Sequence, residues 1–581
     1  MDNLSNIKYL FLSHIWAIVF SILLGVMMIL PQILLIKDLG QDYKGIYIMK
    51  TDAEEHYLAR MQDFAKGYGI GNPFLYEGKG ESPSASFSIS ESILAIPSRV
   101  FGISVPALNL IYKFLLPAII FLLLYGLNYR LTQDKFWSIA TSISIILGYV
   151  IFTTQGIKDL IGMKWTDFPA NMYSRPVNPE LSSILFLSYL HILLSAFREN
   201  SKKILIYLYL IFALSFYIYF YSFTFFLALN AVTFAIFFLV NRKREAVSIF
   251  SISILGLITG CLTFINLYSL THHSDYVYLA PISNIVKSHF PVFSSLGILT
   301  IFVIGFYFYK RRHNLEKDDY FALSLLATAF IAINQQVITG VSIQEGHYHW
   351  YFNTPIYILI LFYIAHKYKD YISINTKFLI CSVFILLSFF TSFLGQYNYY
   401  KYWQPLTTSN QRYAGALVWL DKNASREDVV LSNNESSLLV PIYTKSNVSW
   451  NYFTLAYLTP RERTIYNLFI YLKINNVKPS DIFEEDYFHP PVVNKPETRN
   501  NPGLQFVEVN ILLRDYMTGI YPNNMLSMYK DFYNKSWSEI FKMYKLDYVL
   551  WDKKTDPKWK FDQDNLKIVF ESDNVAIYKI N

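Results

Sequence analysis

The chain has 581 residues, of which 53% are hydrophobic and only 16% are charged. Soluble domains carry about 25% charged residues, so this composition excludes an ordinary soluble protein and indicates lipid as the solvent for much of the chain. The net charge of +7 comes largely from short basic loops between apolar segments, which argues against a nucleic-acid-binding protein. Cys261 and Cys381 both lie in apolar runs, which argues against a disulfide framework or a thiolate metal site.

Apolar segments recur along the first two thirds of the chain. A bilayer core of about 30 Å requires about 20 mostly apolar residues per helix, and several segments are short by this measure. The first segment is long and no small-residue cleavage site follows it, so we expect an uncleaved anchor. We predict an α-helical multi-pass membrane protein with about eleven transmembrane helices, at 13–36, 105–127, 137–152, 181–197, 204–220, 223–240, 247–267, 296–309, 321–338, 354–365 and 378–394.

The distribution of basic residues predicts the orientation, because cytoplasmic loops retain Lys and Arg. Every second connection is short and basic, such as Arg242-Lys243-Arg244, whereas the alternate connections are mostly longer and mixed in charge. We therefore expect the N-terminus in the cytoplasm and the C-terminus outside it. The predicted external loops are 37–104, 153–180, 268–295 and 339–353, together with a tight turn near 221.

The tail beyond the last predicted span changes in character. Short β-rich runs at 428–432, 547–551 and 574–580 alternate with helix-like stretches at 412–420 and 462–473. This pattern is typical of a compact α/β domain. We expect a transmembrane domain over 1–395 and an extracytoplasmic soluble α/β domain over 396–581, interrupted by a proline-rich loop at 489–502.

The first long loop carries an acidic motif shortly after the first span. Asp52, Glu54, Glu55 and His56 lie within five residues and can supply a general base or ligands for a divalent cation such as Mg²⁺ or Mn²⁺. The stretch 52–66, which includes Arg60, also has helical spacing, so the alternative is the solvated face of a surface helix. Farther on, the amphipathic stretch 90–103 is expected to lie along the membrane interface.

The second long loop contains Lys164 and Asp167 and then a proline-stiffened segment with Arg175, Asn178 and Glu180. An arginine at the mouth of a membrane helix can bind a phosphate through two hydrogen bonds. The alternative is a snorkelling arginine beside a glutamate that caps the helix.

The fourth long loop follows the polar end of a span and contains Gln336, Glu345, His347 and His349. Polar side chains at the end of a membrane helix are costly unless they face a cavity. The two histidines can bind a phosphate or a metal, or relay a proton. Their spacing places them on one face only if the segment is extended, and a helical segment would point them apart.

The chain as a whole resembles the GT-C superfamily of membrane glycosyltransferases. The resemblance lies in the Asp52-Ala53-Glu54-Glu55-His56-Tyr57 motif after span one, the amphipathic stretch that follows, the multi-span core and the C-terminal α/β domain. Members typically carry a second acidic residue in the second external loop, for which Asp167 is the candidate.

The resemblance implies transfer of a sugar, with inversion, from a polyprenyl-phosphate donor to a lipid, glycan or protein acceptor outside the cytoplasm. Asp52 would be the general base, with Glu54 and Glu55 beside it, and Arg175, Lys164, His347 or His349 would stabilise the departing phosphate. Metal dependence varies within the superfamily. The remaining implied substrate-binding residues are His56, Arg60, Asp167, Asn178, Gln336 and Glu345.

Two alternatives from other classes stay open. A lipid or polysaccharide transporter without covalent chemistry predicts inverted repeats and charged residues near the bilayer midplane. A membrane-anchored binding or scaffold protein predicts chemistry-rich motifs in 396–581. The sequence displays neither pattern.

Overall fold

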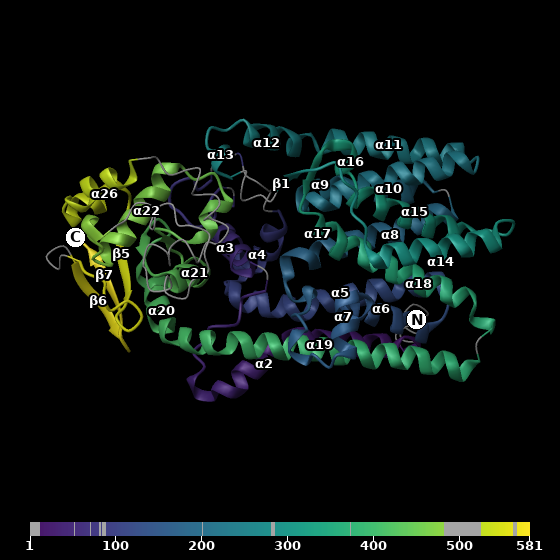
Figure 1. The fold of residues 1–581 in the computed structure, drawn as a ribbon, viewed down its shortest axis with the longest axis horizontal. Coiled ribbons are helices and arrows are strands. Elements are labelled where there is room, and N and C mark those ends of the chain that lie inside the picture. The colour runs from purple at the N-terminus through teal and green to yellow at the C-terminus, as the bar shows by residue number, and fades with distance from the viewer. Residues whose placement is uncertain are drawn as a thin grey trace.

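The computed structural model of the chain describes residues 12–51, 53–69, 71–80, 83, 89–199, 201–279, 285–371, 373–481, 524–561 and 566–581. A bundle of long helices forms one end of the molecule and an α/β region forms the other (Figure 1). The described chain starts at the end of the bundle away from the α/β region, and the C-terminus lies within that region (Figure 1).

The bundle contains a helix at the position of each predicted span. Within the residues that the structure describes, six helical segments are long and apolar enough to cross a membrane, or seven if α11 and α12, bent by 48°, form one broken span. The chain is therefore a membrane-embedded helical protein, but the predicted count of eleven spans is not confirmed. The helices are α2 (Ile15–Leu39), α5 (Val105–Thr132), α6 (Lys135–Ile146), α8 (Ser182–Arg198), α9 (Lys202–Ile218), α10 (Phe220–Leu239), α11 (Lys243–Thr259), α12 (Cys261–Thr271), α14 (Ser295–Arg311), α15 (Lys317–Ile333), α18 (Thr354–Lys367) and α19 (Ile374–Asn410).

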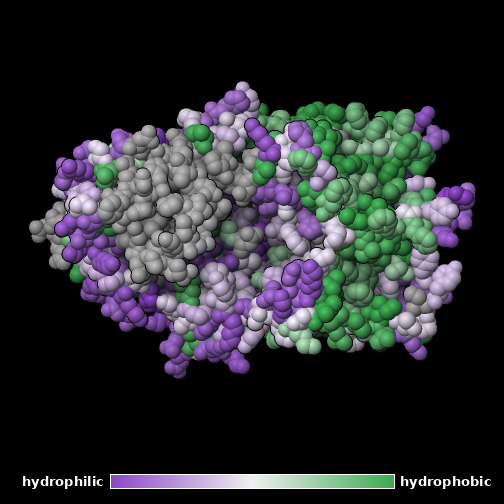
Figure 2. Space-filling model, viewed as in Figure 1, coloured by the Kyte–Doolittle hydropathy of each residue, from purple (hydrophilic) through white to green (hydrophobic). Residues whose placement is uncertain are grey.

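On the face shown in Figure 2, the surface of the bundle is largely apolar, and the coloured part of the α/β region is mostly polar. Large apolar side chains point outward from several helices, for example Val247 on α11 and Phe302 on α14, which is 72% exposed. A continuous surface of this kind is unfavourable in water, so lipid is its natural environment.

The loops that carry the predicted cytoplasmic lysines and arginines meet at one end of the bundle. Arg198 forms an ion pair with Asp318 at 2.6 Å and donates a hydrogen bond to the carbonyl oxygen of Arg130 at 2.7 Å. Lys367 pairs with Glu316 at 3.0 Å. The basic loops therefore lie together, as alternating spans require.

The C-terminal region contains a five-stranded sheet in the order β4-β3-β5-β7-β6. The first three strands of this order are parallel, whereas β7 is antiparallel to both β5 and β6. Central residues of the sheet, such as Val430 and Leu550, are fully buried. The strands are β3 (Val429–Leu431), β4 (Asn447–Val448), β5 (Tyr548–Asp552), β6 (Leu566–Ser572) and β7 (Val575–Ile580), and the helices are α20 (Ala414–Asn423), α21 (Asn434–Tyr443), α22 (Arg461–Ile474), α26 (Met525–Tyr533) and α27 (Trp537–Met543).

This sheet region confirms the predicted mixture of strands and helices. The runs at 428–432, 547–551 and 574–580 form β3, β5 and β7, and the two helix-like stretches form α20 and α22. The proline-rich loop at 489–502 lies outside the described residues.

The first long loop packs against the α/β region. Its two helices, α3 (Glu54–Ala65) and α4 (Ile89–Phe101), lie between the bundle and the sheet (Figure 1). The backbone N–H of Val448 donates to the carbonyl oxygen of Phe74 at 3.0 Å, which ties the loop to the sheet edge. Leu58 and Phe74 share a hydrophobic core with Val430 of the sheet. Since α19 also continues to Asn410, no linker separates the bundle from the α/β region.

Candidate functional site

The predicted site residues lie mostly where the bundle meets the first loop, a place we call the junction. The junction consists of α3, the segment 172–181 before α8, the short helix α17 (Glu345–Tyr348) and the helical turn His349–Asn353 that follows it. Three segments far apart in the sequence thus lie beside one another.

Asp52 itself lies outside the described residues. The residues on either side of it are held in place at the junction. The backbone N–H of Thr51 donates to Oε2 of Glu54 at 3.3 Å, and its hydroxyl donates to the Tyr399 hydroxyl at 3.1 Å. Ala53 precedes α3 in the left-handed conformation, with φ of 59°.

Glu54 is buried and already engaged. Its Oε1 lies 2.6 Å from Nζ of Lys113 and accepts a 2.6 Å hydrogen bond from Asn109. Both partners come from α5, one turn apart, and both are buried. A carboxylate held in this way stabilises the contact between α3 and α5. The same two partners make it a poor proton acceptor. Sequence analysis missed Asn109 and Lys113, although polar residues four apart inside an apolar span are a recognisable signal.

Glu180 has an unusual environment for a carboxylate. It is 0% exposed, and neither of its carboxylate oxygens has a hydrogen-bond partner among the described residues. The positive charges that act on the Glu180 carboxylate are those of Arg175 and Lys113. Burial of a charged group without hydrogen bonds costs several kcal/mol. The Glu180 carboxylate is therefore suited to take up a proton or to accept a hydrogen bond from a ligand. The sequence alone predicts only a helix cap for Glu180.

Arg175 connects the three segments of the junction. Its Nε donates to the carbonyl oxygen of Asn178, which is buried and supports the arginine through its backbone. Its Nη2 donates to the Tyr351 hydroxyl at 3.2 Å, and its guanidinium lies 5.0 Å from the ring centre of Tyr57. A buried guanidinium between two tyrosines is well placed to bind an anion bidentately.

His347 also contacts Tyr351. Its ring stacks on Tyr221 at 4.5 Å, lies 5.5 Å from the Tyr351 ring and forms a hydrogen bond with the Tyr219 hydroxyl. Arg175 and His347 thus both contact Tyr351, although the second and fourth long loops are far apart in sequence.

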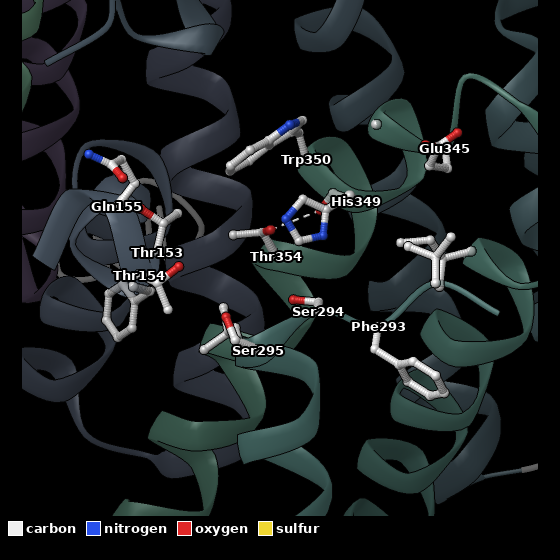
Figure 3. Close-up of a pocket in the computed structure, with 15 residues that line it drawn as sticks. Thr153, Thr154, Gln155, Phe293, Ser294, Ser295, Glu345, His349, Trp350 and Thr354 are labelled. Atoms are coloured by element: carbon white, nitrogen blue, oxygen red, sulfur yellow. Dashed lines mark hydrogen bonds between the residues drawn. The ribbon is translucent and has the colours of Figure 1, made fainter. Parts of the chain in front are cut away.

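His349 points away from this cluster, as a helical backbone requires for residues two apart. It lies in a separate cavity of about 480 Å³, where Figure 3 shows its ring among the side chains of Ser294, Ser295 and Thr354. Thr354 donates a hydrogen bond of 2.8 Å to the carbonyl oxygen of His349. The cavity also has apolar walls and includes Glu345, which accepts a 2.9 Å hydrogen bond from Ser342.

Glu55 lines another cavity, of about 340 Å³, on the side of the α/β region. Lys50 lies between two carboxylates there, 2.8 Å from Glu55 and 3.6 Å from Glu435. Burial raises the pKa of Glu55 despite the nearby Lys50 ammonium. A carboxylate with a raised pKa in a cavity is a candidate general base.

His56 and Arg60 take part in the packing of α3. His56 lies 2.5 Å from the Tyr457 hydroxyl and stacks on Phe453, and burial lowers its pKa to about 3. Arg60 pairs with Glu91 of α4 at 3.1 Å. Because Glu54, Glu55, Arg60 and Asp63 are all buried, the alternative of a solvated helix face is wrong for α3.

The remaining predicted residues do not belong to the cluster around Arg175. Lys164 and Asp167 are exposed, and the hydroxyl of Thr166 donates to Asp167 at 3.1 Å. Gln336 is buried and donates to the carbonyl oxygen of Phe290 at 3.1 Å, so it holds the segment before α14.

Neither a search for metal-binding groups nor a comparison with known proteins assigns a function to the junction. No group of three or more His, Cys, Asp or Glu side chains in the described part of the chain could hold a metal ion. No protein-family model matches the chain, and no curated protein sequence matches it. The argument for function therefore rests on the junction.

Proposed function

We propose that the chain is a membrane glycosyltransferase of the GT-C type, which transfers a sugar with inversion from a polyprenyl-phosphate donor to an acceptor outside the cytoplasm. The observation that carries this proposal is the contact of Tyr57, Arg175, Tyr351 and His347 at one end of the apolar bundle. These residues come from three different loops, and a common ligand accounts for their gathering.

The donor has two parts that match two features of the molecule. Its polyprenyl chain suits the apolar surface of the bundle (Figure 2). Its phosphate suits Arg175, because a guanidinium matches the geometry of phosphate oxygens and keeps its charge at any physiological pH. Arg175 is buried, so its electrostatic effect on developing negative charge is stronger than it would be in water.

The reaction follows from this placement. A carboxylate takes the proton of the acceptor hydroxyl as its oxygen attacks the anomeric carbon. The bond between that carbon and the carrier phosphate oxygen breaks, and the lipid phosphate leaves with the electron pair beside Arg175. Asp52 is our first choice for the base and Glu55 the second, because Glu54 is engaged by Lys113 and Asn109.

The proposed sidedness follows from the basic loops. They contact one another at the end of the bundle away from α3 and α17 (Figure 1), and lysines and arginines are retained in the cytoplasm. The junction and the α/β region then face the outside, where a lipid-linked donor is used after it has been flipped.

The test is transfer of radiolabelled sugar from polyprenyl-phosphate donors in membranes that contain the wild type or Arg175→Ala at matched expression. Labelled acceptor formed by the wild type, and strongly reduced product with Arg175→Ala, would support the proposal. A transporter would move the donor across the membrane with its sugar still attached. A scaffold protein would leave the donor unchanged and in its original leaflet.

A further inference from the structure

The cavity beside Glu55 is built from three parts of the chain. Lys50, Ala53 and Glu55 come from the first loop, Trp403 from the end of α19, and Glu435 and Tyr452 from the α/β region. A cavity that requires all three parts exists only when the first loop and the α/β region are docked. We call it the Trp403 cavity.

The Trp403 cavity lies beyond the apolar part of α19. Trp403 is nine residues past Leu394, where the apolar run ends, which corresponds to about 13 Å along a helix. Ala53 lines the cavity and is the immediate neighbour of Asp52. A ligand in the Trp403 cavity would therefore reach the acidic motif from the aqueous side. A lipid donor would instead reach it from the membrane.

The lining combines flat aromatic rings with charged hydrogen-bonding groups. Trp403 and Tyr452 supply the rings, and Nζ of Lys50 lies 5.7 Å from the centre of the Trp403 ring. The carboxylates of Glu55 and Glu435 accept hydrogen bonds, and the ammonium of Lys50 donates them. Aromatic rings pack against the C–H face of a sugar while such groups bind its hydroxyls, and about 340 Å³ is at the small end of ligand pockets.

The charges of the cavity restrict the ligand further. Two carboxylates and one ammonium give it a net negative charge, with Asn434 and Tyr452 as neutral neighbours. A ligand with a phosphate or carboxylate group would be repelled, whereas a hydroxyl or ammonium group would be attracted.

We propose that the Trp403 cavity binds the acceptor of the transfer reaction, and that this acceptor presents a neutral or amino-substituted sugar ring. This inference rests on the proposed function and specifies its substrate class. The acceptor hydroxyl reaches the acidic motif from the α/β region, while the donor reaches it from the membrane.

The first experiment measures binding without donor. Methyl glucoside, methyl glucosaminide and glucose 6-phosphate are titrated against the purified full-length protein, and binding is followed by saturation-transfer NMR. We expect the first two to bind and glucose 6-phosphate to bind at least tenfold more weakly. Trp403→Ala and Glu435→Gln should each weaken binding at least tenfold.

Two matched variants serve as controls. Tyr402→Ala removes the neighbouring aromatic residue of α19, which is 74% exposed, and Glu427→Gln alters an exposed glutamate of the α/β region. Both should bind the glycosides as the wild type does. Equal binding by Trp403→Ala and Tyr402→Ala, preference for the phosphate, or no binding of any of the three probes would overturn the inference.

The second experiment separates this inference from the proposed function. In the transfer assay, Trp403→Ala and Glu435→Gln should raise the KM for the acceptor at least tenfold and change kcat less than KM. A wild type that turns over the donor, with variants whose acceptor KM is unchanged, contradicts the Trp403 cavity alone. A wild type that never uses a lipid-phosphate donor, yet binds the glycosides through Trp403 and Glu435, contradicts the proposed function and leaves a sugar-binding site.

Discussion

Nη2 of Arg175 donates a 3.2 Å hydrogen bond to the hydroxyl of Tyr351, so the second and fourth long loops meet through one guanidinium. The same guanidinium lies near Tyr57 of the first loop, with 5.0 Å between the guanidinium carbon and the ring centre. Both Arg175 and Tyr351 are buried. The arginine is therefore held in one position before any ligand binds, which is what electrostatic stabilisation of a leaving phosphate requires.

Removal of the Tyr351 hydroxyl tests this arrangement. A hydrogen bond to a charged group contributes about 1.5–3 kcal/mol, so Tyr351→Phe should lower kcat/KM for sugar transfer by roughly 10- to 100-fold. The matched control is Tyr348→Phe, since the Tyr348 hydroxyl bonds Thr224 at 2.7 Å and not Arg175. Equal losses in both variants would indicate general damage to this segment.

The sequence predicted the elements of this protein better than the contacts between them. Apolar runs and β-rich runs are local signals, and they correctly predicted a helical bundle of apolar helices and the strands β3, β5 and β7, but not the number of membrane spans. The eventual neighbours of Arg175 could not be read from the sequence, because Tyr57 and Tyr351 are ordinary aromatic residues until the loops fold together. The burial of α3 was missed for the same reason, since its polar face is covered by α4, α5 and the α/β region.

The orientation follows from the basic loops. We expect Asn581 to lie outside the cytoplasm, because the basic connections gather at the opposite end of the bundle from the α/β region. An alkaline phosphatase fused after Asn581 should be active in a bacterial host, and one fused at Arg242, in a basic connection, should be inactive. The reverse pattern would invert the protein and place the junction in the cytoplasm.

The buried pair of Glu54 and Lys113 should matter for stability. Loss of one partner of a buried ion pair typically costs about 3–5 kcal/mol, because the other charge stays buried and unpaired. Lys113→Met should thus lower the apparent unfolding temperature in detergent by several degrees, and the double variant Lys113→Met/Glu54→Gln should recover part of the loss. Lys553→Met, which removes half of a more exposed pair with Glu571, should change stability by no more than about 1 kcal/mol. A double variant less stable than Lys113→Met would contradict this account.

His56 should make the protein sensitive to acid. Its pKa is about 3 in the folded protein, whereas an unfolded histidine has a pKa of about 6.5, so the folded state binds fewer protons between these values. The stability that neutral His56 contributes is present above pH 6.5 and is lost as the pH falls toward 3, by up to about 2 kcal/mol at pH 5.

The change His56→Phe keeps an aromatic ring and removes the titrating group. Between pH 7.5 and pH 5 the unfolding temperature of this variant should fall less than that of the wild type. His313→Phe, at an exposed histidine, should follow the wild type. Parallel pH profiles for all three proteins would show that His56 is not the acid-sensitive group.

The identity of the general base is the prediction closest to the chemistry. Asp52 follows Thr51, which is anchored to Glu54 and Tyr399, and precedes Ala53, which lines the Trp403 cavity. Asp52→Asn keeps the size of the side chain but removes most of its basicity. Loss of a general base typically lowers the rate about 100- to 10,000-fold, so transfer from a labelled polyprenyl-phosphate donor should fall by this factor while expression and unfolding temperature stay unchanged.

The matched control for Asp52→Asn is Asp167→Asn. Asp167 is exposed and lies outside the cluster around Arg175, so this variant should transfer sugar as the wild type does. If Asp52→Asn is nearly as active as the wild type and Glu55→Gln is not, the base is Glu55, whose carboxylate lies in the Trp403 cavity with a raised pKa.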